Sequence, residues 1–244
     1  MNQKIEELDL LLASLKLGSI RQNLPGALDR AREGRPSYSD FLLELLKQEQ
    51  NDKVERQLEY RIKQAKLPER WPLESYPFEL QPTVDKTQIN QLGELDFLKG
   101  ARNLVFMGPT GVGKTGLASG ILLKALENGH RGLFIKAQDL FDEMYASLAD
   151  RSTRRLINRL MNIELLLIDE MGYLNLRPEQ TNAFFKLMDA RHRQRTTLIT
   201  TNLEYDQWFS FLGRKQMVEA LLDRLKQNCT TIRIEGRSLR APLN

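Results

Sequence analysis

The chain has 244 residues, of which 41% are hydrophobic, so it can hold one sizeable α/β domain and a small extra one. Its net charge of +4 permits nucleic-acid binding, but a merely solvated basic surface explains that charge equally well. The single cysteine, Cys229, excludes an intramolecular disulfide framework and a cysteine-rich zinc site. Because the sequence shows no signal peptide and no long apolar segment, we expect a cytoplasmic protein without a membrane contact.

Residues 1–66 are predicted to form an all-helical domain. Apolar residues from Ile5 onward recur at spacings of three and four, and Gly18 is expected to end this first helix. A second helix is expected to begin near Pro25, because proline suits a first turn. Ser37 and Asp40 resemble a capping box that opens a long third helix. The second half of that helix mixes Lys and Arg with Asp and Glu, so we favour a solvated face over a DNA-contacting edge.

Residues 67–86 are predicted to be a linker, since prolines interrupt regular structure there. The aromatic residues Trp71, Tyr76 and Phe78 either anchor this segment or line a pocket for a nucleotide base, and we favour anchoring. A helix through Ile89 and Leu98 should then lead into the first strand.

The strongest motif in the chain follows a short apolar run, Leu104 to Met107. The next residues fit G-x-x-x-x-G-K-[ST] at every fixed position, and a helical pattern continues to Gly129. A buried strand, a glycine-rich turn and a helix in this order predict a phosphate-binding loop rather than a turn that binds nothing. The residues expected to bind the nucleotide are Gly108, Pro109, Thr110, Gly111, Val112, Gly113, Lys114, Thr115 and Gly116.

Each residue type in this loop has a physical role. The glycines let backbone N–H groups point into one concavity, where the start of the helix adds partial positive charge. Lys114 is expected to neutralise the β- and γ-phosphates, and the Thr115 hydroxyl is expected to ligate Mg²⁺. The sequence therefore predicts ATP and Mg²⁺ as the bound groups.

A basic segment follows a second strand, 132–135, and its helix. Its four arginines are expected on one helix, with 151, 155 and 159 on a common face and no acidic partner after Asp150. Contact with a DNA phosphate backbone and a solvated or subunit-interface role are equally favoured by this pattern. The residues are Arg151, Arg154, Arg155 and Arg159.

A third apolar strand, 163–168, ends in Asp169 and Glu170. This is the Walker B arrangement, in which Asp169 holds Mg²⁺ through its water shell and Glu170 orients and deprotonates the attacking water. An acidic pair that only caps a helix is the less favoured alternative, given the upstream phosphate-binding loop. A fourth strand, 196–201, ends at Asn202, which would reach the γ-phosphate and the water but also suits a turn. The alternating run 230–234 is expected to be an edge strand.

The order of these motifs resembles that of the AAA+ ATPases, and most closely the IstB family of insertion-sequence ATP-binding proteins, which help DDE transposases. The matching pieces are G-P-T-G-V-G-K-T-G-L-A, L-L-I-D-E-M-G-Y, T-T-L-I-T-T-N, A-L-L-D-R-L and G-R-S-L-R, with S-Y-S-D-F-L-L-E-L-L and A-K-L-P in the helical part. The resemblance spans nearly the whole chain, and DnaC-type helicase loaders are close relatives in the same initiator branch.

The resemblance implies an AAA+ domain over 87–244, with a parallel sheet of order 5-1-4-3-2 and no C-terminal lid. It further implies a homo-oligomer, a ring or spiral with ATP at subunit interfaces, that binds double-stranded DNA. Arg224, in the D-R-L motif, is then the arginine that would complete the site of a neighbouring subunit, while the role of Arg240 stays open. The residues expected to act in ATP hydrolysis are Lys114, Asp169, Glu170, Asn202 and Arg224.

The leading functional hypothesis is an ATPase that assembles on target DNA with ATP, activates a DDE transposase, and disassembles on hydrolysis. The alternative is a DnaC-like adaptor that loads a replicative helicase. A P-loop kinase or GTPase is disfavoured, because no guanine-reading N-K-x-D is present and Glu170 stands where a kinase needs no water activator.

Overall fold

The computed structural model describes residues 2–172, 174–213 and 215–240. The chain divides into two compact units, an N-terminal unit of residues 1–60 and a C-terminal unit of residues 61–244. The predicted limits of the helical domain, the linker and the ATPase domain stay predictions. Among the described residues, no helix combines the length and the apolar character that a membrane crossing requires.

The N-terminal unit holds α1 (Asn2–Ser14), α2 (Gly18–Gly34) and most of α3 (Tyr38–Gln64). Its small core consists of Ile20, Leu24, Ala27 and Leu45. The expectation that α2 begins near Pro25 is wrong, because the helix starts at Gly18 and contains Pro25. A buried carboxylate explains the earlier start: Glu49 accepts hydrogen bonds from the backbone N–H groups of Ser19 and Ile20, at 2.8 and 2.9 Å, and so satisfies the first turn of α2.

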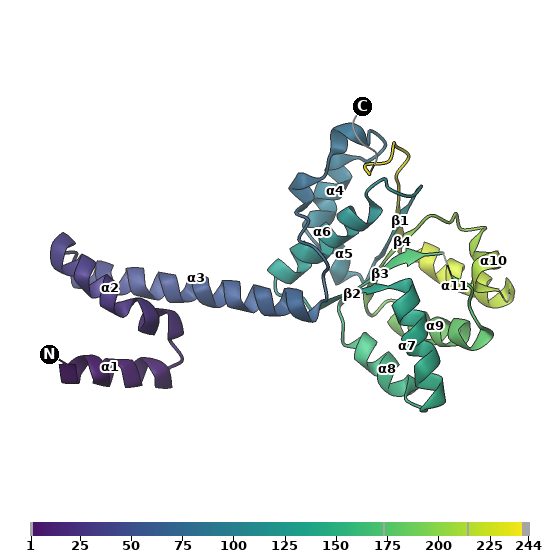
Figure 1. The fold of residues 1–244 in the computed structure, drawn as a ribbon. Coiled ribbons are helices and arrows are strands. Elements are labelled where there is room, and N and C mark those ends of the chain that lie inside the picture. Colours follow the sequence, from purple (N-terminus) through teal and green to yellow (C-terminus); the bar gives the residue numbers. More distant parts are fainter. Residues whose placement is uncertain (1, 173, 214, 241–244) are drawn as a thin grey trace. The chain divides into compact units, whose positions relative to one another are not determined.

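The C-terminal unit is built on a five-stranded parallel sheet (Figure 1). Its strands are β1 (Asn103–Met107), β2 (Gly132–Lys136), β3 (Leu165–Met171), β4 (Thr196–Thr201) and β5 (Cys229–Arg233). They lie in the order β2-β3-β4-β1-β5, which is the predicted order 5-1-4-3-2 counted from the other edge. β5 is the edge strand that its alternating sequence predicts. The α/β fold with a preceding helical region is therefore confirmed.

Helices cover both faces of the sheet, as Figure 1 shows. On one face α6 (Lys114–Glu127) packs across β1 to β4. The other face carries α7 (Ala137–Ala149), α8 (Thr153–Met161), α9 (Pro178–Arg191), α10 (Trp208–Leu212) and α11 (Lys215–Gln227). Burial on both faces is why β1, β3 and β4 are almost continuously apolar or threonine-rich.

The segment before β1 packs onto α6 and does not form one continuous helix. It contains two short 3-10 turns, η1 (Leu73–Ser75) and η2 (Phe78–Leu80), then α4 (Lys86–Gly93) and α5 (Asp96–Lys99). The single helix expected through Ile89 and Leu98 is wrong. Leu95 has a left-handed backbone, with φ 65°, which breaks the helix and lets both Leu95 and Phe97 become buried.

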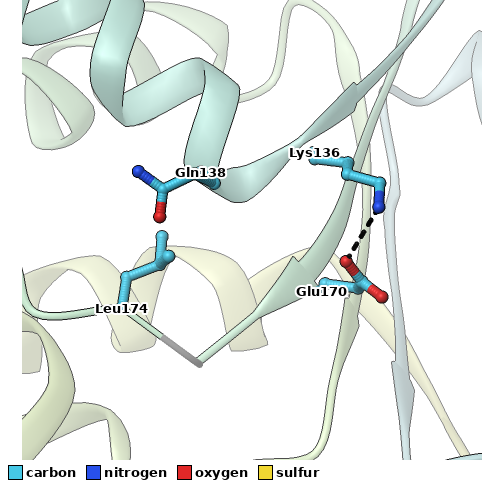
Figure 2. A pocket seen from close by; sticks show the side chains of 4 residues that line it. All are labelled: Lys136, Gln138, Glu170 and Leu174. Atoms are coloured by element: carbon cyan, nitrogen blue, oxygen red, sulfur yellow. Dashed lines mark ion pairs between the residues drawn. The ribbon is translucent and has the colours of Figure 1, made fainter.

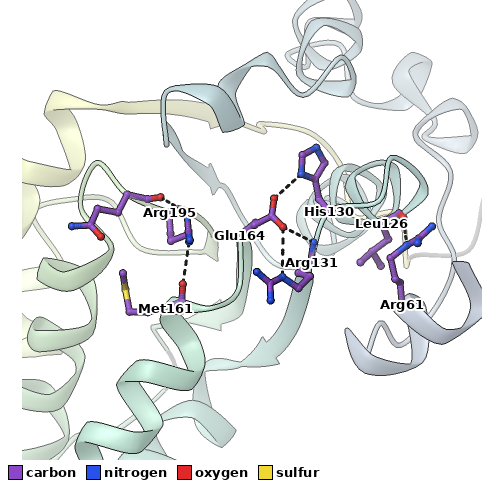
Figure 3. A network of polar contacts seen from close by, with 8 residues as sticks. Arg61, Leu126, His130, Arg131, Met161, Glu164 and Arg195 are labelled. Carbon is purple, nitrogen blue, oxygen red and sulfur yellow. Dashed lines mark hydrogen bonds and ion pairs between the residues drawn. The ribbon is translucent and has the colours of Figure 1, made fainter. Parts of the chain in front are cut away.

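A network of polar contacts lies at the amino ends of the strands (Figure 3). Glu164, just before β3, contacts the His130 ring nitrogen Nδ1 at 2.8 Å and accepts from the backbone N–H of Arg131 at 3.2 Å. Arg195 donates to the Met161 carbonyl at 3.0 Å, and Arg61 donates to the Leu126 carbonyl at 2.7 Å. These contacts join loops at this end of the sheet to the ends of neighbouring helices.

Candidate nucleotide site

The predicted phosphate-binding loop joins β1 to α6. Gly111 and Gly113 have φ of 88° and 92°, a backbone region that side chains other than glycine rarely adopt, so the loop needs glycine at both positions. Lys114 donates from Nζ to the carbonyls of Gly108 and Pro109, at 2.8 and 2.6 Å. Partial burial lowers the pKa of Lys114, an effect that the Asp169 carboxylate opposes. All nine predicted residues, 108–116, thus lie in one turn and the first turn of α6.

Asp169 lies beside this loop, at the carboxyl end of β3. Its Oδ1 accepts from the Thr115 hydroxyl at 2.8 Å and from the Thr200 hydroxyl at 2.5 Å. Burial raises the pKa of Asp169, and the hydrogen bonds from Thr200 and Thr115 act in the opposite direction. Thr200 was not predicted from the sequence, although its place near the end of an apolar strand beside β3 is the signal that could have found it.

The oxygens of Thr115 and Asp169 fit a Mg²⁺ site. A hydroxyl and a carboxylate oxygen 2.8 Å apart are hard oxygen ligands of the kind Mg²⁺ prefers. In the part of the chain that the structure describes, no group of three or more His, Cys, Asp or Glu residues could hold a metal ion. A Mg²⁺ ion here would therefore share its coordination with water and substrate phosphates, as magnesium does in nucleotide sites.

Glu170 sits on a β-bulge. Between β3 and β4 the pairing moves from Ile168 with Ile199 to Met171 with Thr201, so β3 has one extra residue. Glu170 has φ 60°, and its backbone N–H bonds to the Thr200 hydroxyl at 2.9 Å. Bulges next to functional sites redirect side chains. This one turns Glu170 out of the alternation, so that it is exposed at the site while Asp169 stays buried.

The carboxylate of Glu170 faces a lysine whose role was not predicted from the sequence. Lys136, the last residue of β2, places Nζ 3.4 Å from Oε2 of Glu170. Figure 2 shows this ion pair. Both residues line a cavity of about 250 Å³ together with Gln138 and Leu174. Lys136 could have been found from its position, because it ends a buried strand next to β3, in register with Asp169.

Asn202 follows β4 directly, as expected. A Cβ added to Gly172 would lie 3.0 Å from its Oδ1, so the side chain sits against the backbone just past Glu170. That oxygen is buried, and among the described residues it has no hydrogen-bond partner. A buried amide oxygen without a partner in the described part of the chain, next to Gly172, is consistent with the predicted role at the reacting water, which stays a prediction.

The two arginines near the end of the chain occupy different places. Arg224 lies on α11, is 48% exposed, and forms an ion pair of 2.6 Å with Asp189 of α9. Arg240 belongs to a segment that covers the phosphate-binding loop, where Leu239 donates its N–H to the Gly111 carbonyl at 2.9 Å. The charge of Arg240 contributes to the lowered pKa of Lys114. Arg240 therefore lies within electrostatic reach of the nucleotide site.

The arginine cluster differs from the expected single helical face. α8 begins at Thr153, so Arg151 stands in the preceding turn with φ 58°, and only Arg154, Arg155 and Arg159 lie on the helix. No acidic residue follows Asp150 within this segment, but Arg159 forms an ion pair with Glu143 of α7, which precedes it in the chain. The turn arises because Ser152 donates its N–H to the Asp150 carboxylate, at 2.9 Å. Leu156 and Leu160 are buried, so the exposed arginines lie on the solvent side.

The model of the IstB-like ATP binding protein family matches residues 10–243. The chain belongs to this family. A Pseudomonas aeruginosa protein named for insertion sequence IS21 and for ATP binding is 33% identical over 97% of this chain and 89% of its own length. A Bacillus thuringiensis protein named in the same way for insertion sequence IS232 is 31% identical over 98% of this chain and 96% of its own length. The family match thus includes the helical N-terminal region as well as the nucleotide site.

Solved structures support the AAA+ fold of this IstB-like chain. The DnaC helicase loader is 21% identical, with a TM-score of 0.53 over 61% of this chain and 87% of its own. DnaI is 19% identical, with a TM-score of 0.54 over 62% of this chain and 85% of its own. Replication initiator DnaA bound to AMPPCP and single-stranded DNA is 16% identical, with a TM-score of 0.55 over 68% and 50%. At these identities the likeness concerns the fold alone.

Proposed function

We propose that this IstB-like chain hydrolyses ATP and, with ATP bound, assembles on double-stranded DNA to activate a DDE transposase. Hydrolysis then drives disassembly. The observation that carries the proposal is the group formed by Lys114, the Thr115–Asp169 pair and the outward-turned Glu170 at the carboxyl edge of the sheet. These are the parts that phosphoryl transfer to water requires.

The residues divide the work of hydrolysis. Lys114 would exchange its two carbonyl contacts for phosphate oxygens, and the loop N–H groups would cradle the remaining oxygens. Thr115 and Asp169 would hold Mg²⁺, which neutralises charge developing on the phosphates. Glu170 would orient and deprotonate the water. Its contact with Lys136 fixes one carboxylate oxygen and leaves the other for that water.

Arg224 is proposed to complete the site of a neighbouring subunit in the homo-oligomer. It is half exposed, and a surface ion pair such as the one with Asp189 contributes little to stability, so the Arg224 guanidinium can exchange that partner for a phosphate.

The variant Arg224→Ala should bind ATP and hydrolyse it poorly. Adding Lys114→Ala subunits, which carry an intact Arg224, should restore turnover. Lys226→Ala, a cation two positions along the same helix, serves as the control, and absence of rescue at every mixing ratio would contradict a role in trans.

DNA contact is proposed for the arginine cluster, defined as Arg151, Arg154, Arg155 and Arg159. Because Arg159 is paired with Glu143, the first three supply most of the available charge. Subunits lined up by ATP would repeat this cluster along a common path, so that modest charge per subunit becomes a multivalent track. Binding to duplex DNA should therefore require ATP, weaken steeply with salt and show little sequence preference.

The experiment that tests DNA contact compares two matched double variants. Arg151→Glu with Arg155→Glu should weaken ATP-dependent duplex binding and flatten its salt dependence. Lys47→Glu with Lys53→Glu makes the same charge change at exposed positions of α3. Arg56, also on α3, is avoided as a control position because a glutamate there would place a second carboxylate beside the buried Glu49. If the α3 variant loses more affinity, the N-terminal unit is the principal DNA contact.

Partner choice separates the transposition role from helicase loading. The alignment with relatives named for insertion sequences covers nearly the whole chain, whereas the helicase loader matches in fold over 61% of it. We therefore expect the chain to bind the transposase of its own element in an ATP-dependent pull-down. Binding to the replicative helicase of the host instead would favour the helicase-loading alternative.

A further inference from the structure

The segment before η1 lies in a groove on α6 made by two glycines. Gly116 and Gly120 are four residues apart and so share a helical face. A Cβ on Gly120 would come within 2.7 Å of Leu73 and 2.8 Å of the Trp71 carbonyl. One turn further along, Lys124 pairs with Glu74 at 3.2 Å. The backbone around Trp71 is therefore pressed directly against the helix that begins at the phosphate-binding loop.

Tyr76 fastens this segment to the loop itself. Tyr76 is 5% exposed, and its hydroxyl donates to the Val112 carbonyl at 3.0 Å. Its ring would come within 2.7 Å of a Cβ on Gly113, and Leu239 would come within 3.0 Å of the same atom. Tyr76 thus anchors the segment, in agreement with the favoured interpretation of the sequence.

Trp71 behaves differently from this anchor. Its six-membered ring lies over Gly116, where an added Cβ would be 3.3 Å from Cε3. Its Nε1 donates to Glu69 at 2.6 Å, which fixes the orientation of the indole. Yet the residue stays 41% exposed, while Leu73 and Tyr76 beside it are buried. An oriented aromatic ring thus remains open to solvent next to the first turn of α6.

The order of the phosphates decides which side of the loop faces the nucleoside. Lys114 and the magnesium ligands define the γ-phosphate end, and Asp169 and Glu170 lie on that side. The nucleoside is attached at the opposite end of the triphosphate. It must therefore leave the loop on the side away from Asp169, and Trp71 covers α6 on another face than the Thr115–Asp169 contact.

We infer that Trp71 binds the base of the nucleotide by stacking, with the indole held in place by Glu69 and the Gly116–Gly120 groove. This inference rests on the proposed ATP site and identifies its nucleoside end. Stacking uses the face of the base, so it strengthens binding without reading hydrogen-bonding groups. A glycine directly after Thr115 fits this arrangement, because a Cβ there would lie 3.3 Å from the indole and the ring would have to shift slightly.

The test measures binding of ATP and of inorganic tripolyphosphate to the full chain and two variants. Trp71→Ala should weaken ATP binding by about tenfold, the usual effect of losing one aromatic–base stack, and leave tripolyphosphate binding unchanged. Trp71→Phe should bind ATP nearly as well as the parent. Thermal unfolding of each variant checks the fold, which Leu73 and Tyr76 should preserve. Equal losses for both ligands, or no loss for either, would overturn the inference.

Fluorescence gives a second, independent measurement. The only other tryptophan, Trp208, is fully buried, so acrylamide should quench chiefly Trp71. ATP should protect this emission from acrylamide and tripolyphosphate should not, and Trp71→Phe should abolish the protection. If the parent binds no ATP at all, the proposed function fails together with this inference. If it binds ATP without protecting Trp71, only the inference fails.

Discussion

The two ends of the parallel sheet both carry charged side chains, but they use them in opposite ways. At the carboxyl end Glu170 is turned outward on a bulge and contacts Lys136 through one oxygen, and the buried Asn202 oxygen has no partner among the described residues, so polar atoms there can still bind a ligand. At the amino end Arg191 is 1% exposed and donates to three backbone carbonyls and the Thr197 hydroxyl. Charge alone therefore does not identify a site. The two ends differ in how many hydrogen-bonding atoms of these side chains already have partners within the chain.

Glu164, just before β3, and Glu170, near the end of β3, show the same contrast. Glu164 precedes the strand and is held by His130 and Arg131, whereas Glu170 near its end faces Lys136 and a cavity. Substitutions at the carboxyl end should change chemistry and leave stability nearly constant. Substitutions at the amino end should lower stability and leave ATP binding and turnover nearly constant.

The largest effect is expected for Glu170→Gln. The amide cannot accept a proton from water, so ATP turnover should fall by about 10²- to 10⁴-fold while ATP affinity is retained. Steady-state turnover and equilibrium nucleotide binding check this pair of outcomes. If Glu170→Gln hydrolyses ATP at the parental rate, Glu170 does not activate the water. Glu164→Gln provides the control at the other end of β3.

Arg191→Met should be the most damaging change at the amino end. It removes a buried cation and leaves the carbonyls of Leu160, Ile163 and Thr196 without this donor, which should lower the free energy of unfolding by about 3–5 kcal/mol. Urea unfolding measures the loss. Arg195→Met, whose residue is only partly buried, should cost far less. Under conditions where Arg191→Met is folded, its ATP affinity should match the parent, and a selective loss of affinity would break the distinction between the two ends.

Lys114→Ala should affect binding and not stability. The alanine removes charge-assisted hydrogen bonds to phosphate, worth about 1.5–3 kcal/mol, so ATP affinity should fall by about 10- to 150-fold. Lys124→Ala, on the same helix and paired with Glu74, is the matched control. Titration calorimetry measures ATP affinity for both variants. If Lys114 contacts phosphate, only Lys114→Ala should lose affinity, whereas a general effect of charge would lower the affinity of both variants.

Much of the nucleotide site could be predicted because its residues lie within short stretches of chain with fixed spacing. The loop 108–116, Asp169 and the strand order follow from local patterns and from a familiar arrangement. The bulge at Glu170 and the contacts of Thr200 and Lys136 depend on how β3 pairs with β2 and β4, and no local pattern specifies that register.

Two errors have a similar physical origin. The helix 18–34 begins well before Pro25 because Glu49, distant in sequence, caps its first turn. The arginine helix begins later than its spacing indicated, because Asp150 and Ser152 make a turn that competes with helix formation. Tertiary capping and side-chain turns of this kind shift element boundaries without changing the order of the elements.

The smallest effect is expected for Glu164→Gln, and its pH dependence sharpens the comparison. Burial acts to raise the pKa of Glu164, but its contacts with His130 and Arg131 outweigh burial and hold the pKa below the ordinary value of 4.5. A carboxyl group with a lowered pKa stabilises the folded state above its unfolded pKa and loses that contribution as pH falls. Because the side chain is about one-third exposed, we expect a difference of only about 0.5–1 kcal/mol between parent and variant at pH 7. This difference should be lost as pH falls below about 4.5, where Glu164 becomes protonated, as urea unfolding at stepped pH would show. A difference that persists at pH values well below 4.5, or a change in ATP turnover, would mean that Glu164 does more than hold the amino end together.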